Sequence, residues 1–182
     1  AATLAFSAIQ NNDKVGLMLF TDQVELFIPP KKGRMHVLWI IRELLEFKPE
    51  HNNTDISFAL KSLTNVLKKK AIVFIMSDFL DDNYENSLKI VSQKHDVTGI
   101  RIYDEREESL PNVGLIQAKD AETNKLVWIN TSLASVRKKY KRYYTDRVNY
   151  FNKTFNLSGA GRISTKVEES YVKKLLSYFK AR

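Results

Sequence analysis

Three short and almost wholly apolar runs constrain this chain more than any other feature of its sequence. They are KVGLMLF (14–20), AIVFIMS (71–77) and VTGIRIY (97–103). Short, β-branched runs of this kind predict strands that are buried on both sides. Segments with helical periodicity separate them, and this alternation is typical of an α/β domain whose mainly parallel sheet is covered by helices on both faces.

The first hundred residues predict eight elements. VELFI (24–28) is expected to be an antiparallel edge strand beside the first run, and Pro29 and Pro30 are expected to end it. Thr54 is a good candidate for the N-cap of the helix that follows it. The predicted order is a helix up to residue 12, strands 14–20 and 24–28, helices 34–47 and 54–67, strand 71–77, helix 84–94 and strand 97–103.

The chain changes character after Tyr103. An acidic loop leads into a predicted hairpin of VGLIQA (113–118) and LVWI (126–129), with KDAETNK as its loop. A long helix is expected to follow and to end at 158–161, and Thr165 with Glu168 has the spacing of a capping box for a last helix. We therefore predict an α/β domain over 1–132 and a helical extension over 133–182. The long helix is expected to bury the stripe Leu133, Val136, Tyr140, Tyr143, Tyr144, Val148, Phe151 and Phe155.

Charge is distributed unevenly along the chain. Residues 133–182 carry 13 basic and three acidic residues, a net charge of +10, whereas residues 1–132 carry 16 basic and 18 acidic residues. The chain has no cysteine, which excludes disulfides and thiol chemistry and fits a cytoplasmic protein. No apolar run approaches the roughly 18 residues that a transmembrane helix needs.

Three carboxylates follow the buried run 71–77. Ligands bind at the carboxyl ends of strands in open parallel sheets, and Asp78 stands at such an end. Asp78 and the Thr54 hydroxyl are oxygen ligands suited to a hard cation such as Mg²⁺. The alternatives are that Asp78 caps a turn and that Thr54 is only an N-cap. Asp81 and Asp82 are expected to be a solvated turn before the helix near Tyr84.

Several segments, taken together and in order, resemble one protein family. They are NNDKVGLMLFTD, IPPKKGRMHVLWIIRELL, TDISFAL, IVFIMSDFL and HDVTGIRIYDERE with SLPNVGLIQAKDAETNK. The chain resembles the von Willebrand factor A-like proteins of the bacterial domain-of-unknown-function family fifty-eight, although the match thins after about Ser132. The resemblance implies a doubly wound, Rossmann-type α/β fold with a metal-ion-dependent adhesion site. It assigns the threonine ligand of that site to Thr54 and the aspartate ligand after the fourth strand to Asp78.

One part of the family pattern is missing. The Asp-x-Ser-x-Ser motif that supplies most metal ligands is absent, and the nearest string, Asp55-Ile56-Ser57, lies in a different element. The family's first strand would precede Ala1 and lie between strands 14–20 and 71–77. We therefore expect an N-terminally truncated domain that binds little or no metal by itself, although the intact protein binds Mg²⁺. Its unpaired strand edges are expected to favour self-association.

The resemblance also implies a function. Members of this family are often encoded beside MoxR-type AAA+ ATPases, which implies a non-enzymatic protein-interaction module that acts in complex assembly or maturation. The expected partner is such an ATPase or another von Willebrand A protein. One alternative is a nucleic-acid or anionic-surface binder, although no nucleic-acid motif supports it; another is a metal-dependent phosphohydrolase. The residues 133–153 are either a solvated helix face or a docking surface that uses Arg137, Lys138, Lys141 and Arg142.

Overall fold

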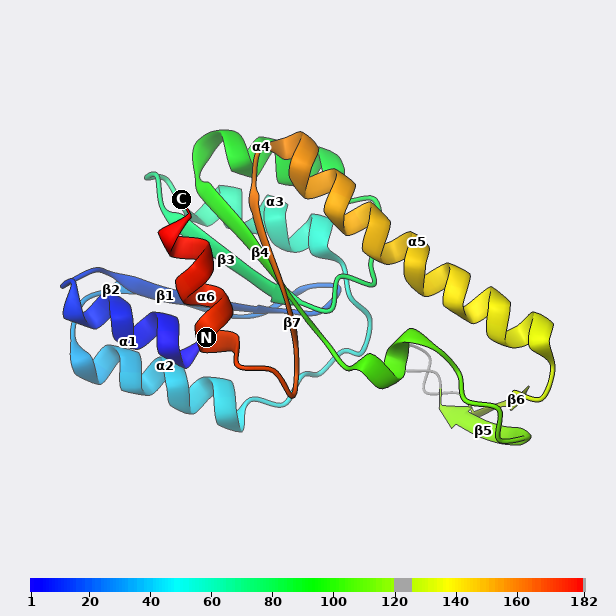
Figure 1. Ribbon diagram of the computed structural model, residues 1–182. Helices are drawn as coiled ribbons and strands as arrows, with labels where there is room; N and C mark the ends of the chain where they lie inside the picture. The colour runs from blue at the N-terminus through cyan, green and yellow to red at the C-terminus, as the bar shows by residue number, and fades with distance from the viewer. Residues whose placement is uncertain (120–125, 182) are drawn as a thin grey trace.

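The computed structural model describes residues 1–119 and 126–181, which form a mixed α/β fold (Figure 1). The expected α/β class is confirmed. In chain order the elements are α1 (Ala2–Gln10), β1 (Val15–Phe20), β2 (Val24–Lys31), α2 (Arg34–Glu46), α3 (Ile56–Val66), β3 (Ile72–Ser77), α4 (Glu85–Lys94), β4 (Asp96–Tyr103), the 3-10 helix η1 (Glu105–Glu108), β5 (Leu115–Lys119), β6 (Leu126–Asn130), α5 (Ala134–Ser158), β7 (Gly161–Lys166) and α6 (Tyr171–Lys180).

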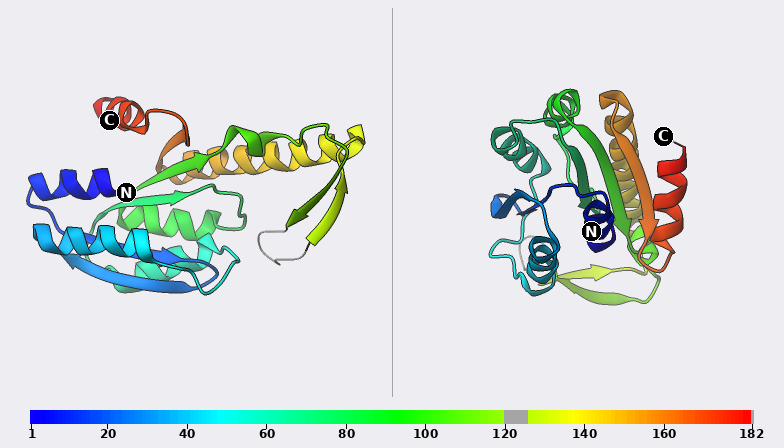
Figure 2. Two further views of the ribbon diagram at one scale, coloured as in Figure 1. Left: turned by 90° about the horizontal axis from the view of Figure 1, so that it is seen from below. Right: turned by 90° about the vertical axis from the view of Figure 1, so that its left-hand side faces the viewer.

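The centre of the fold is a parallel sheet in the order β3-β4-β7. Helices lie on both of its faces (Figures 1 and 2). On one face, Gly99 of β4 lies directly under the rings of Phe151 and Phe155 from α5. On the other face, Phe74 of β3 contacts Phe179 of α6 edge to face, with the ring centroids 6.0 Å apart. The buried core lies between the sheet and helices α3, α4 and α5; it contains Ile56, Leu60, Ile75, Phe79, Tyr84, Leu88, Val91, Val97, Phe151 and Phe155.

Strand β7 was not expected from the sequence. Residues 161–166 pair in parallel with β4, and Ile100 lies opposite Ile163. The proposed capping box is therefore wrong, because Thr165 lies inside this strand. Helix α6 begins only at Tyr171, and its N-cap residue Ser170 makes no side-chain cap hydrogen bond. The division of the chain at residue 132 stays a prediction, although β7 joins a segment of the predicted extension to the central sheet.

Strands β1 and β2 form a separate antiparallel pair, as expected. The prediction that Pro29 and Pro30 end β2 is wrong, because the strand continues to Lys31. The register shifts between Val15 and Leu17, opposite the two prolines. Such an irregularity at an edge accommodates residues that have no N–H to donate. Gly16 leaves room there, because a Cβ at this position would lie 2.9 Å from the Ile28 carbonyl oxygen. Within the described residues β1 has no hydrogen-bonded pairing with β3, and the doubly wound arrangement stays a prediction.

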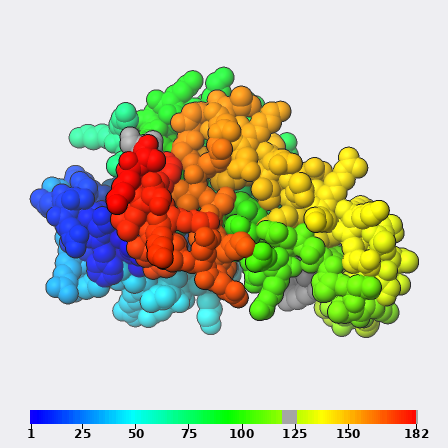
Figure 3. Space-filling view, in the orientation of Figure 1, coloured from blue at the N-terminus to red at the C-terminus, as the bar shows by residue number. Residues whose placement is uncertain are grey.

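The expected hairpin is present as β5 and β6, which pair with Ile116 opposite Ile129. Most of its predicted loop lies outside the described residues. Together with the N-terminal half of α5, the hairpin forms a lobe beside the body of the molecule, which the space-filling view shows (Figure 3). We call this lobe, made of residues 113–119 and 126–142, the arm.

Helix α5 begins at Ala134 and ends at Ser158; its C-cap residue Gly159 has a φ of 71°, in the left-handed region that favours glycine. The predicted apolar stripe is buried only in its central and C-terminal part, where Tyr144, Phe151 and Phe155 face the sheet. Leu133 and Tyr143 are exposed, which contradicts the prediction that they belong to the buried stripe. Leu133 is exposed because the first turns of α5 extend beyond the sheet (Figure 1), whereas Tyr143 lies at the surface beside Arg147, whose guanidinium carbon is 5.1 Å from the centroid of its ring.

Candidate site at the carboxyl edge of the sheet

Asp78 follows the last residue of β3 and is exposed, as its place in the sequence predicts. One of its carboxylate oxygens, Oδ1, accepts hydrogen bonds from the Leu80 amide at 3.2 Å and from the Ser77 hydroxyl at 3.3 Å. The capping alternative is therefore correct in part. No hydrogen bond is made to Oδ2 by the described residues. The next residue, Phe79, is buried and has a φ of 56°, so the chain turns sharply just after Asp78.

Thr54 is exposed and lies just before helix α3, but it is not the N-cap. That position belongs to Asp55, whose Oδ1 accepts a hydrogen bond from the Phe58 amide at 2.7 Å. The predicted N-cap is therefore wrong by one residue. The Asp55 amide donates a hydrogen bond to the carbonyl oxygen of Thr21 at 3.0 Å, and this contact helps to set the start of the helix at Asp55. The Thr54 side chain makes no hydrogen bond to the described residues, so its hydroxyl is available as a ligand.

Asp81 joins the loop after β3 to the start of α3. Its Oδ2 accepts a hydrogen bond from the Ile56 amide at 2.8 Å, and its Oδ1 accepts one from the Asp82 amide at 2.7 Å. Burial raises the pKa of the Asp81 carboxyl, and these two hydrogen bonds oppose the shift. The expectation that Asp81 belongs to a solvated turn before α4 is wrong, because it binds the positive end of α3 instead.

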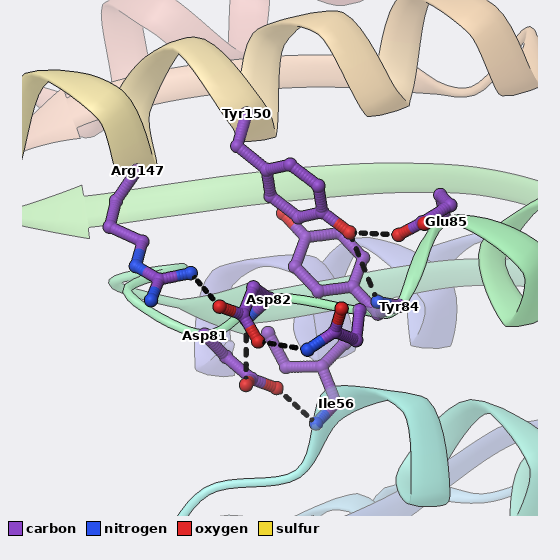
Figure 4. A network of polar contacts seen from close by, with 8 residues as sticks. Ile56, Asp81, Asp82, Tyr84, Glu85, Arg147 and Tyr150 are labelled. Atoms are coloured by element: carbon purple, nitrogen blue, oxygen red, sulfur yellow. Dashed lines mark hydrogen bonds and ion pairs between the residues drawn. The ribbon is translucent and has the colours of Figure 1, made fainter.

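Asp82 and its neighbours connect the same loop to α5 (Figure 4). Asp82 forms an ion pair with Arg147, so it is not simply a solvated turn residue. Tyr150 accepts a hydrogen bond from the Tyr84 amide at 3.1 Å and donates one to Glu85. Sequence reasoning missed this network because its members come from segments more than 60 residues apart. Arg147 and Tyr150, three residues apart on one helix, gave no separate signal.

Arg101 is a buried cation near the same edge, level with Ser77 in the neighbouring strand. Its guanidinium carbon lies 4.1 Å from the ring centroid of Tyr103, and it donates a hydrogen bond to the Tyr144 hydroxyl. Arg101 forms no ion pair with the described residues, so its charge is balanced by two aromatic rings instead of a carboxylate. This contact holds the middle of α5 against β4.

The described residues contain no cluster of three or more histidine, aspartate or glutamate side chains that could hold a metal ion. Thr54 and Asp78 nevertheless lie on two loops that the Asp81–Ile56 hydrogen bond joins. Their free oxygens suit Mg²⁺ chemically, but two ligands fall short of the near-octahedral sphere that Mg²⁺ requires. The assignment of Thr54 and Asp78 as metal ligands stays a prediction.

The four basic residues proposed for partner binding have different environments. Lys138 and Lys141 are exposed and form no ion pair with the described residues. Arg142 is exposed and lies 3.9 Å from Asp146. Arg137 donates to the carbonyl oxygens of Thr131 and Ser132, so it stabilises the turn between β6 and α5.

Comparison with known families gives a clear match. The sequence profile described as "Protein of unknown function DUF58" matches residues 1–149. The chain belongs to the DUF58 family. This confirms the family resemblance, while the von Willebrand A relationship and the link to MoxR-type ATPases stay predictions. The match ends inside α5, so β7 and α6 lie beyond it.

Curated relatives are uncharacterized proteins. One from Mycobacterium tuberculosis and one from Mycobacterium bovis are each 25% identical over 126 residues, which is 68% of this chain and 40% of the relative. One from Mycobacterium avium is 22% identical over 158 residues, covering 85% of this chain and 93% of that protein. The DUF58 chain therefore spans less than half the length of the first two relatives.

A solved structure supports the fold. The crystal structure of an aerotolerance-related membrane protein from Bacteroides fragilis, with multiple mutations to serines, is similar with a TM-score of 0.58 and 12% identity. The similarity covers 100% of this chain and 87% of that one. In the part of the DUF58 chain that the structure describes, no helix is both long enough and apolar enough to cross a membrane.

Proposed function

We propose that this DUF58 protein is a non-enzymatic interaction module with an adhesion-type Mg²⁺ site, in which Thr54 and Asp78 are two of the ligands. The remaining ligands would come from residues outside the 182-residue chain. The proposed partner is a MoxR-type AAA+ ATPase or another von Willebrand A protein, and the role is complex assembly or maturation.

The observation that carries this proposal is the pair of free oxygens at the carboxyl edge. Asp78 Oδ2 and the Thr54 hydroxyl are exposed and make no hydrogen bond to the described residues. The Asp81–Ile56 hydrogen bond joins the loop that follows Asp78 to the start of α3, two residues after Thr54. Exposed oxygens at the carboxyl edge of a parallel sheet suit a shared cation site.

The chain's own residues have separate tasks in this mechanism. When bound, Mg²⁺ would supply a positive centre that attracts a carboxylate of the partner. Ser77 and the Leu80 amide hold the Asp78 carboxylate through Oδ1, which would leave Oδ2 available to bind the cation. Asp81 and Asp55 fix the start of α3 and thus the position of Thr54.

The same proposal includes the strand order of the complete sheet. We infer that β1 and β3 flank the place of one further strand, supplied from outside this chain, which would unite the two sheets into a doubly wound one. In support, neither β1 nor β3 has a partner on that side within the described residues. Both strands are apolar, as expected for strands in the middle of a covered sheet.

Binding to a MoxR-type AAA+ ATPase tests the proposal. A version of the chain extended at its N-terminus would be measured against the immobilised MoxR-type ATPase, with Mg²⁺ and with EDTA. We expect binding only with Mg²⁺, and we expect Asp78→Ala and Thr54→Ala to abolish it. Thr54→Ser retains the hydroxyl and should preserve binding.

Asp13→Ala is the control, because Asp13 is an exposed carboxylate away from this edge and should leave binding unchanged. Binding that persists in EDTA, or that survives Asp78→Ala, would contradict the metal-dependent mechanism.

A further inference from the structure

The β5–β6 hairpin exposes large apolar side chains that the rest of the described chain leaves uncovered. Trp128 and Leu126 each keep just over 60% of their surface exposed, and Leu115 and Val127 are exposed as well. Neighbouring residues of a strand point to opposite faces, so Trp128 and Val127 lie on different sides of the hairpin. The hairpin is therefore an apolar wedge, since both of its faces present apolar groups to solvent.

The base of this wedge is firmly held. The Thr131 hydroxyl donates to the Gly114 carbonyl oxygen at 2.7 Å and accepts from the Val113 amide at 3.1 Å. The strands lie beside the central sheet, not within it, and run from the N-terminal end of α5 back toward the body of the molecule (Figures 1 and 2). A two-stranded hairpin alone is at best marginally stable in water. An external surface that covers its apolar side chains would therefore stabilise it.

A cationic surface adjoins the wedge. Lys138 and Arg142 are four residues apart on α5, so they share one side of the helix, opposite the side on which Tyr140 and Tyr144 lie. Lys141 is exposed beside them, and neither it nor Lys138 is neutralised by a described acidic residue. The Arg142–Asp146 pair is largely exposed to solvent, with 3.9 Å between its charged atoms, and such a pair neutralises little charge.

Within the part of the chain that the structure describes, the acidic 3-10 helix η1 contacts the other side of α5. Burial raises the pKa values of Tyr140 and Tyr144, and the negative charges of Glu107, at Tyr140, and of Glu108, at Tyr144, add to the shift, which agrees with η1 lying on the tyrosine side of the helix. Glu105 of the same element pairs with Lys166 at 2.8 Å. The positive charge of Lys138, Lys141 and Arg142 is thus directed outward.

We propose that the arm docks on an anionic lipid bilayer, with Trp128 and Leu126 in the interfacial layer and Lys138, Lys141 and Arg142 against the headgroup phosphates. Charge complementarity favours an anionic surface. A bilayer suits this combination, because its interfacial layer offers an apolar region for Trp128 and Leu126 directly beneath phosphates that attract the neighbouring cations. Tryptophan is enriched at membrane interfaces. The apolar contact and the charge attraction are both needed, because either one alone would bind the bilayer only marginally.

Intrinsic fluorescence tests this proposal directly. The chain has two tryptophans, so Trp39→Phe leaves Trp128 as the sole reporter. We expect a blue shift of its emission with vesicles of phosphatidylglycerol and phosphatidylcholine, none with phosphatidylcholine alone, and loss of the shift at high salt. Lys138→Gln with Arg142→Gln should weaken the partitioning at least about tenfold.

Vesicle co-sedimentation gives a second readout that needs no tryptophan. Leu126→Ser with Trp128→Ser should abolish binding to anionic vesicles. The matched control is Lys173→Gln with Lys180→Gln, which removes the same charge from exposed positions on α6 and should leave binding unchanged. Circular dichroism checks that each variant is folded, and the charge variants remain informative if the hairpin variant unfolds.

Three results would overturn the proposal. One is the absence of a blue shift with anionic vesicles. Another is that the α6 control variant weakens vesicle binding as much as the Lys138→Gln, Arg142→Gln variant does, which would mean that only the total charge of the protein matters. The third is equally tight binding to a DNA duplex, which would favour a nucleic-acid surface instead. Bilayer binding should persist in EDTA and in Asp78→Ala, so its failure is distinguishable from failure of the proposed metal site.

Discussion

At the scale of single residues, the three aspartates after β3 have three different roles. Asp78 is exposed at the carboxyl edge, as its position in the sequence predicted. Asp82 forms an ion pair with Arg147. Asp81 accepts a hydrogen bond from the amide of Ile56, the first residue of a helix that begins 25 residues earlier in the chain. Patterns in a sequence predict local contacts such as caps and turns. The partners of Asp81 and Asp82 were not predictable because tertiary packing decides them.

The pH dependence of stability should reveal Asp81. Burial raises its pKa in the folded state above the ordinary 3.8. Folding therefore favours the protonated form, so the stabilisation by Asp81 is complete below the ordinary pKa and is lost as pH rises through the folded pKa. We expect the free energy of unfolding of the wild type to fall relative to Asp81→Asn between about pH 3 and pH 6. Urea denaturation measures this, with exposed Asp146→Asn as control; a rise would contradict the prediction.

Tyr150 tests the link between the β3–α4 loop and α5. Its hydroxyl accepts the hydrogen bond of the Tyr84 amide, which has no other acceptor among the described residues. Tyr150→Phe should therefore lower the free energy of unfolding by about 1–2 kcal/mol in urea denaturation. Tyr171→Phe is the control, since its exposed hydroxyl has a single contact with Thr3 at 3.4 Å. Equal effects of the two substitutions would contradict the assigned role of Tyr150.

At the scale of elements, strand β7 is the strand that hydrophobic patterns in the sequence did not predict. Its sequence GRISTK has one large apolar residue, and Thr165 with Glu168 mimics a helix start. The signal that was present is alternation, because Ile163 and Thr165 are buried while Arg162 is exposed. A strand at the edge of the sheet needs only one strongly apolar position, and such a signal is too weak to outweigh a capping pattern. The apolar runs 14–20, 71–77 and 97–103 form β1, β3 and β4 because their apolar content is nearly continuous.

Gly99 tests how closely β4 packs against α5. A Cβ there would lie 2.5 Å from ring atoms of Phe155, so Gly99→Ala should destabilise the fold by about 1–3 kcal/mol. Adding Phe155→Leu should remove part of this cost, which a double-mutant cycle in urea denaturation would measure. Strictly additive effects would mean that the two positions do not share this contact.

At the scale of the whole molecule, the sequence predicted the α/β class, the β1–β2 pair and the β5–β6 hairpin. It did not predict where the strands that belong to different sheets would lie, because that depends on packing across the whole chain. Within the described residues, β1 and β3 each keep one side without a strand partner. Such edges are templates for pairing with another chain.

Self-association through these edges is a testable consequence. Sedimentation velocity should show species larger than the monomer that increase with protein concentration. Ile72 is exposed on β3, and Ile72→Lys should reduce these species because a charged residue on an edge strand opposes pairing. Leu45→Lys, at an exposed position on α2, is the matched control. A monomer at every concentration would contradict the prediction.

The central claim is that Thr54 and Asp78 belong to an adhesion-type Mg²⁺ site, and thermal unfolding with and without Mg²⁺ tests it most directly. The measurement would use this chain, a version extended at its N-terminus, and the extended version carrying Asp78→Ala. A ligand that binds the folded state raises the unfolding temperature. The account predicts that Mg²⁺ stabilises only the extended version and that Asp78→Ala abolishes the effect. If Mg²⁺ shifts neither version, or stabilises the Asp78→Ala variant equally, the claim is wrong.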